Sequence, residues 1–150
     1  MKIASARLGD VTINPAEIIT FPDGIIGFPD FKRYVELPFL ESSPLTILQA
    51  VDAAELGFFL IDPYLFLADY TLTISDEDLA GMNAQGPDEL VIKTIVTIPE
   101  DPYDMTANLQ GPLIINAKSR LARQIVNNDK NYSTKHRIIS SHPEPAPVAG

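Results

Sequence analysis

The residue types that commonly carry catalysis or bind metals are sparse and poorly spaced in this sequence. It has no cysteine and only two histidines, His136 and His142, which lack the i, i+4 spacing of a helical zinc site. Glu100, Asp101 and Asp104 share one turn, but their spacing does not match a twelve-residue calcium loop. We also find no nucleophile elbow and no phosphate-binding loop. The sequence therefore predicts a protein that is not an enzyme and binds no metal or cofactor.

Recognition of another protein is the chemistry that segment 57–70 indicates instead. Most of this segment is apolar, and an exposed apolar patch often marks a binding site. At such sites aromatic rings supply buried area, and carboxylates help to orient the partner. The alternative, that the rings fill the core, is equally compatible with the sequence. The candidate partner-binding residues are Asp62, Tyr64, Phe66, Asp69 and Tyr70.

The charge of the chain is negative and unevenly distributed. The net charge is −9, with fourteen acidic residues and one base in residues 34–117 and a net charge of +4 in residues 118–150. The acidic middle would repel nucleic acid phosphates, so we expect no direct nucleic acid binding. It would attract a basic protein, at a rate that falls with salt. Solubility alone is the other explanation of the acidity. The candidate steering charges are Asp76, Glu77 and Asp78.

Two asparagines next to apolar strands, Asn108 and Asn116, are further candidates for the rim or support of a binding surface. An asparagine in this setting either caps a backbone turn or faces a ligand, and the first role is the more common.

The elements that position these residues are expected to be short strands. Thirteen prolines are scattered through the chain, and runs rich in Ile, Val, Thr, Phe and Tyr alternate with turn residues. This pattern predicts a mainly β fold, a small antiparallel barrel-like single domain with one or two short helices. The expected strands are Ile3–Leu8, Val11–Ile13, Ile18–Phe21, Arg33–Leu37, Leu45–Val51, Gly57–Ile61, Tyr70–Ile74, Val91–Ile98, Leu113–Asn116 and Arg123–Val126.

Three local signals refine this prediction. Gly9-Asp10 suits a two-residue hairpin turn. Ser75, followed by three acidic residues, predicts a helix that runs to about Met82. A second short helix is expected to begin near Pro87.

The length of 150 residues predicts one domain, which we assign to residues 1–137. We expect residues 138–150, rich in proline and small residues, to form a flexible tail. No apolar run approaches the roughly 20 residues that cross a bilayer, and the first residues lack a secretory signal. We therefore expect a cytoplasmic protein that does not associate with membranes.

Several motifs together resemble the FliW family of flagellar assembly factors over roughly residues 1–136. The motifs are Phe-Pro-Asp-Gly-Ile-Ile-Gly-Phe (21–28), Asp-Pro-Tyr-Leu-Phe (62–66), Met-Thr-Ala-Asn-Leu (105–109), Pro-Leu-Ile-Ile-Asn-Ala-Lys (112–118) and Tyr-Ser-Thr-Lys-His (132–136). Each motif alone is weak, but their order and spacing together are specific.

The resemblance implies a non-enzymatic regulator with two protein partners. Proteins of this family bind flagellin and also CsrA, a small RNA-binding repressor of flagellin translation, and the two partners exclude each other. CsrA could be antagonised by an acidic mimic that covers its RNA site, or by docking beside that site. Two other functions remain compatible with the residues, a split-barrel enzyme that binds a flavin and a generic acidic adaptor protein.

Overall fold

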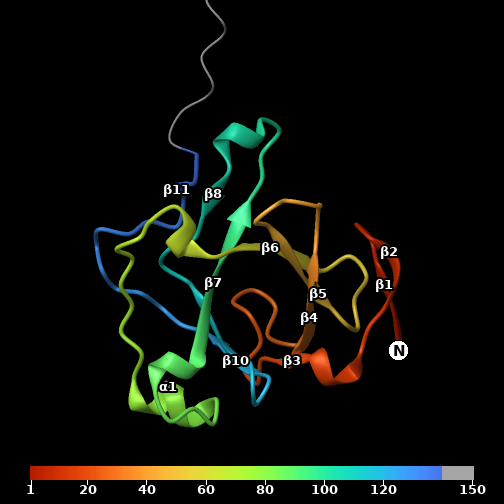
Figure 1. The fold of residues 1–150 in the computed structure, drawn as a ribbon, viewed down its shortest axis with the longest axis horizontal. Coiled ribbons are helices and arrows are strands. Elements are labelled where there is room, and N and C mark those ends of the chain that lie inside the picture. The colour runs from red at the N-terminus through yellow and green to blue at the C-terminus, as the bar shows by residue number, and fades with distance from the viewer. Residues whose placement is uncertain (140–150) are drawn as a thin grey trace, which may run out of the picture.

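The computed structural model describes residues 1–139, which form a barrel of short strands with a separate hairpin beside it (Figure 1). The strands are β1 (Lys2–Ser5), β2 (Gly9–Thr12), β3 (Ile19–Thr20), β4 (Arg33–Pro38), β5 (Thr46–Ala50), β6 (Gly57–Ile61), β7 (Leu90–Thr97), β8 (Thr106–Ala107), β9 (Leu113–Asn116), β10 (Leu121–Gln124) and β11 (His136–Arg137). The one α-helix in the described part of the chain is α1 (Asp76–Gly81), and 3-10 turns are η1 (Pro15–Glu17), η2 (Pro63–Leu65), η3 (Pro87–Glu89) and η4 (Pro102–Asp104).

The strands close into a ring. Strands β7, β6, β5, β4, β3, β10 and β9 are hydrogen-bonded in that order, and β9 pairs again with β7. The pairs are antiparallel except that β10 runs parallel to β3, where Leu121 lies opposite Thr20. Strands β8 and β11 extend the sheet beyond β7. The mainly β, barrel-like fold predicted from the sequence is confirmed.

Apolar side chains from opposite walls of the ring fill its interior. The rings of Phe21 and Tyr34 meet edge to face at a centroid distance of 5.4 Å, and both side chains are fully buried. On β9, Leu113 and Ile115 point into this cluster, whereas Ile114 packs with Met82 in a second cluster beneath α1. Because α1 covers its outer face, β9 is buried on both sides and reads as a continuous apolar run.

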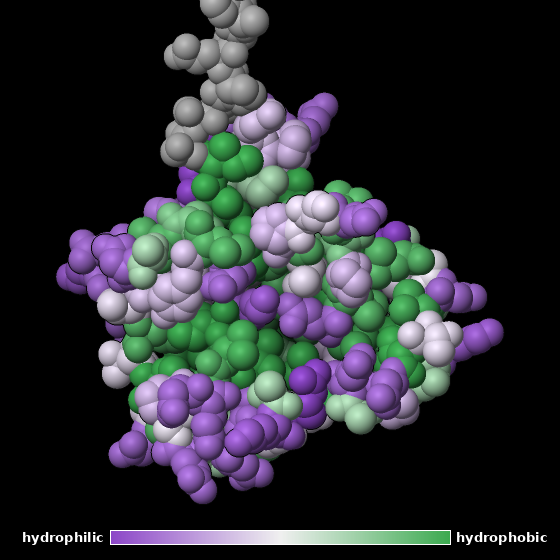
Figure 2. All heavy atoms as spheres, viewed as in Figure 1, coloured by the Kyte–Doolittle hydropathy of each residue, from purple (hydrophilic) through white to green (hydrophobic). Residues whose placement is uncertain are grey.

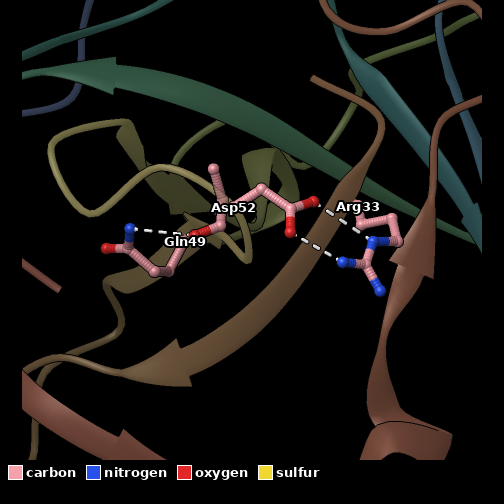
Figure 3. A network of polar contacts seen from close by, with 4 residues as sticks. Arg33, Gln49 and Asp52 are labelled. Carbon is pink, nitrogen blue, oxygen red and sulfur yellow. Dashed lines mark hydrogen bonds and ion pairs between the residues drawn. The ribbon is translucent and has the colours of Figure 1, made fainter. Parts of the chain in front are cut away.

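The turn between β5 and β6 is braced by the buried amide of Gln49 (Figure 3). Its Nε2 lies within 3.3 Å of four backbone carbonyl oxygens of this turn, and its Oε1 accepts a 2.8 Å hydrogen bond from the Ser5 hydroxyl of the separate hairpin. On the exposed side of the turn, the Arg33 guanidinium forms a bidentate ion pair with the Asp52 carboxylate (Figure 3). The Gln49 amide therefore links the N-terminal hairpin to the barrel, together with the 2.8 Å hydrogen bond from the Ala6 N–H to the Ala54 carbonyl and the packing of Ile3 and Ile13 on Val35.

The hairpin turn differs from the predicted two-residue turn at Gly9-Asp10. Ser5 pairs with Gly9, so the loop consists of residues 6–8. Gly9 has φ = +76°, and a left-handed residue at the end of a three-residue loop lets the two strands resume pairing.

The expected strand at Tyr70–Ile74 is wrong. The described chain there is extended but pairs with no strand, because side chains satisfy its backbone: the Thr71 N–H donates to the Tyr132 hydroxyl, and the Thr71 carbonyl accepts from Asn127. The expected strand at Arg123–Val126 begins earlier, as β10, because Leu121 pairs with Asn116 of β9.

The remaining elements follow the predictions more closely. The helix after Ser75 is α1, and the short helix near Pro87 is the 3-10 turn η3. Strands β8 and β11 were not predicted; each has two residues. Of the expected tail, residues 140–150 lie outside the described part of the chain. No helix in residues 1–139 is both long enough and apolar enough to cross a bilayer.

Candidate protein-interaction surface

The structure places eight of the ten candidate residues in two groups on different elements. We call the first group, Asp62, Tyr64, Phe66, Asp69 and Tyr70, the aromatic surface; it lies on η2 and the turn after it. We call the second group, Asp76, Glu77 and Asp78, the α1 surface. Asn108, between β8 and β9, and Asn116, at the end of β9, belong to neither group. Figure 2 shows hydrophilic atoms gathered over α1, at the lower left of the view.

Tyr64 is presented to solvent by the start of η2. Asp62 caps this turn, because its Oδ1 accepts a 2.9 Å hydrogen bond from the Tyr64 N–H, and Pro63 sets the backbone angle of the first turn residue. The Tyr64 side chain remains 42% exposed, and its neighbour Leu65 is 63% exposed. Burial raises the pKa of the Tyr64 phenol, and the Asp62 carboxylate adds to the rise. The phenol is therefore neutral at physiological pH and can donate a hydrogen bond.

Tyr70 supports this surface from below and is only 3% exposed. Its hydroxyl donates a 2.6 Å hydrogen bond to the Leu109 carbonyl and accepts one from the Asn127 amide. Its ring meets that of Tyr64 edge to face at 6.1 Å and lies 4.8 Å from that of Tyr132. Burial raises the pKa of Tyr70. Direct contact with a partner would require the covering chain to move, so Tyr70 positions Tyr64.

Phe66 and Asp69 complete the first group. Phe66 is half-buried, packs on the cluster that contains Leu109, and stacks on the His136 ring at a centroid distance of 5.6 Å. Asp69 is exposed. The sequence left open whether the three aromatic rings form a surface or fill the core. The structure separates them, since Tyr64 is exposed, Phe66 is intermediate and Tyr70 is buried.

The three carboxylates of the α1 surface have different roles. Ser75 and Asp78 form a reciprocal capping box, in which the Ser75 hydroxyl accepts from the Asp78 N–H and the Asp78 carboxylate accepts from the Ser75 N–H. Asp78 also pairs with Arg123 of β10 at 3.1 Å. Asp76 and Glu77 are exposed, so they are the two carboxylates free to steer a partner.

Both asparagines bond to the chain's own backbone. Asn108 Oδ1 accepts hydrogen bonds from the N–H groups of Gln110 and Gly111, so this side chain caps its own turn. Asn116 is 1% exposed; its amide donates to the Met82 carbonyl, and its oxygen accepts from the Lys118 N–H. Since Met82 ends α1, Asn116 supports the α1 surface by fixing the helix to β9.

The structure also exposes apolar side chains that sequence reasoning did not select. Ile26 is 68% exposed and Phe28 is 39% exposed. The loop that carries them is tight: Gly24 has φ = +71°, and a Cβ there would lie 2.7 Å from the Pro29 Cα. The two glycines that flank Ile25-Ile26 were the available signal. No group of three or more metal-binding side chains lies close together within residues 1–139.

Known proteins match nearly the whole described part of this chain. The model of the family described as FliW protein matches residues 2–138. Proteins named flagellar assembly factor FliW are 43% identical in Natranaerobius thermophilus, with 93% of each chain covered, and 42% identical in Treponema denticola, with 93% of this chain and 95% of the relative covered. A crystal structure of the flagellar assembly factor FliW superposes with a TM-score of 0.87 at 35% identity, over 95% of this chain and all of the other. The chain therefore belongs to the FliW family.

Proposed function

We propose that this protein is a non-enzymatic flagellar assembly factor that binds flagellin and CsrA in the cytoplasm, one partner excluding the other. When flagellin occupies it, CsrA is free to repress flagellin translation. When flagellin has been exported, the protein sequesters CsrA and translation resumes. The observation that carries this proposal is the family match over residues 2–138, together with relatives that are named flagellar assembly factors.

The charge distribution supports a basic partner. CsrA must hold RNA phosphates and therefore carries positive surface, and residues 34–117 here have one base against fourteen acids. Two of these acids, Asp76 and Glu77, are exposed on α1, where they would act on the rate of encounter. The same acidity argues against direct nucleic acid binding.

The aromatic surface supports a specific contact. Tyr64 and Leu65 are adjacent, exposed and held by a capped turn, so a partner that buries them would gain apolar area without ordering a mobile loop. Tyrosine is enriched among the residues that dominate binding energy at the centre of interfaces, so Tyr64 is the expected anchor.

Calorimetric titration with CsrA, repeated after the protein has been preloaded with flagellin, tests the proposal. We expect saturable binding of CsrA that preloading abolishes. Absence of binding to both partners would refute the proposal. A third titration, into CsrA saturated with target RNA, separates the two modes of antagonism: a ternary complex excludes direct mimicry of RNA, because mimicry requires the RNA site to be empty.

A further inference from the structure

A groove that none of the roles above explains lies between α1 and the loop after β3. It has a volume of about 370 Å³ and is lined by Pro22, Asp23, Glu77, Ala80, Gly81 and Arg123. The helix, the loop and β10 are held together here by two ion pairs of Arg123, with Asp78 at 3.1 Å and with Asp23 at 3.5 Å. In Figure 1, α1 and β10 lie at the same end of the molecule.

The groove is lined by both apolar and charged groups. Pro22, Ala80 and Gly81 contribute short apolar surface, and the Arg123 side chain, 29% exposed, lies against Gly81. The side chain of Asp23 is 75% exposed, and Glu77 is exposed and forms no ion pair with residues 1–139. Asp78, in contrast, is 17% exposed and sits against the guanidinium. One positive charge therefore faces three carboxylates, so the groove carries a net negative charge, and Glu77 contributes a carboxylate that Arg123 does not pair.

We propose that this groove receives a lysine or arginine side chain from a partner protein. The aliphatic stem of such a side chain would lie on Pro22 and Ala80, and its charged end would reach Asp23 and Glu77. Long basic side chains bury their methylene groups on apolar surface while the head group stays at a polar rim, which is the arrangement that this groove offers. A neutral apolar side chain in the groove would gain no electrostatic attraction from Asp23 and Glu77.

Rigidity of the groove favours this role. The capping box fixes the start of α1, Asn116 fixes its end, and the Ile26 N–H donates a 2.8 Å hydrogen bond to Gln124 of β10. The loop that forms the other wall is thus tied to β10 as well. Ile26, 68% exposed in the same loop, can meet an apolar neighbour of the inserted basic residue. A preformed site loses little conformational entropy on binding.

The first test requires no knowledge of the partner. Blocked tripeptides Ala-Lys-Ala and Ala-Arg-Ala are titrated into 15N-labelled protein, with Ala-Gln-Ala as the neutral probe. We expect saturable shifts in the millimolar range at the amides of Ala80, Gly81 and Arg123 with the two basic peptides only. Equal shifts with the neutral peptide, or shifts spread over the whole acidic surface, would overturn the proposal.

Paired variants make the test specific. The groove variant combines Asp23→Asn with Glu77→Gln, and the charge-matched control variant combines Asp10→Asn with Glu55→Gln, two exposed acids of the hairpin and of the β5–β6 turn. We expect the groove variant to bind the basic peptides about three- to tenfold more weakly than the control, the sum of two exposed ion pairs. Ala80→Met, which adds bulk to the groove lining but leaves the charge unchanged, should weaken binding as well.

The second test rests on the proposed function, because it uses CsrA. The groove variant should bind CsrA about three- to tenfold more weakly than the control variant, and its affinity should fall less steeply with salt. Equal affinity of the two variants would overturn the groove as a partner site. Failure of the unaltered protein to bind CsrA would refute the proposed function instead, and the tripeptide titration would then decide the groove on its own.

Discussion

The buried hydroxyl of Tyr34 leads to a quantitative prediction for the variant Tyr34→Phe. This side chain is fully buried in the barrel, and its oxygen has no hydrogen-bond partner among the described residues. A buried hydroxyl without a partner costs about 1–3 kcal/mol. Tyr34→Phe removes this cost, but the small void that phenylalanine leaves offsets part of the gain. We therefore expect stabilisation by about 1 kcal/mol at pH 8. For a chain of this length that corresponds to a rise in Tm of about 2–4 °C.

The same burial gives a pH dependence with a defined sign. Desolvation raises the pKa of Tyr34 to about 12, whereas an unfolded tyrosine has a pKa of about 10. Between these two pKa values the tyrosine ionises in the unfolded chain but stays neutral in the folded protein. The free energy of unfolding is therefore unaffected below pH 10 and falls as the pH rises toward 12. At pH 11 the loss is about 1.4 kcal/mol, and by pH 12 it exceeds about 2 kcal/mol. The Tyr34→Phe variant lacks this loss, so its advantage should widen above pH 10.

Urea denaturation followed by circular dichroism at pH 8, 10 and 11 measures both effects. Comparison with the unaltered protein cancels the titration of Tyr64 and Tyr70, whose pKa values burial also raises. Tyr64→Phe, at an exposed position, is the control and should change stability by less than about 0.5 kcal/mol at pH 8. If Tyr34→Phe destabilises the protein at pH 8, the hydroxyl has a partner such as a buried water, and the reasoning is refuted.

Three further predictions concern the loop, the helix and the steering charges. Gly24→Ala should destabilise the protein by about 1–3 kcal/mol in urea, because its φ is positive and a Cβ would meet backbone atoms; an unchanged midpoint would contradict the tight loop. Asn116→Ala should cost about 1–3 kcal/mol and accelerate hydrogen exchange in α1, and exchange equal to that of the unaltered helix would contradict its anchoring role. Asp76→Lys, at an exposed carboxylate of α1 that does not line the groove, should slow CsrA association measurably at low salt in stopped flow, with dissociation nearly unchanged. Asp10→Lys, the same charge change on the hairpin, should have a smaller effect, and equal slowing would assign the steering to net charge alone.

Much of the fold could be predicted from the sequence because its signals are local. Runs of β-branched and aromatic residues between prolines marked most of the strands, and Ser75 with Asp78 marked the helix. Residues 70–74 have the same composition but form no strand. The backbone of Thr71 is instead bonded by Tyr132 and Asn127, more than fifty positions away, and no local pattern reports such a partner.

The candidate surface was predicted less completely for the same reason. Tyr64 and Tyr70 look alike in the sequence, yet one is exposed and the other buried, because the Tyr70 hydroxyl reaches the carbonyl of Leu109. Asn116 was selected for its polarity next to apolar residues, but its partner, the Met82 carbonyl, lies 34 positions earlier. Residue types identified the region, and contacts distant in sequence decided which side chains face solvent.

Closure of the barrel has a consequence for synthesis of the chain. The ring is completed where β10 pairs with β3, between Leu121 and Thr20, residues that are separated by most of the described chain. At ribosomal rates of about 5–20 residues per second, β10 leaves the ribosome roughly 5–20 s after β3. During that time β3 has no partner on one side, and an unpaired edge strand can pair with other chains. Contacts of such long range also slow folding after release, so the last pairing to form should be the one that protects the barrel from aggregation.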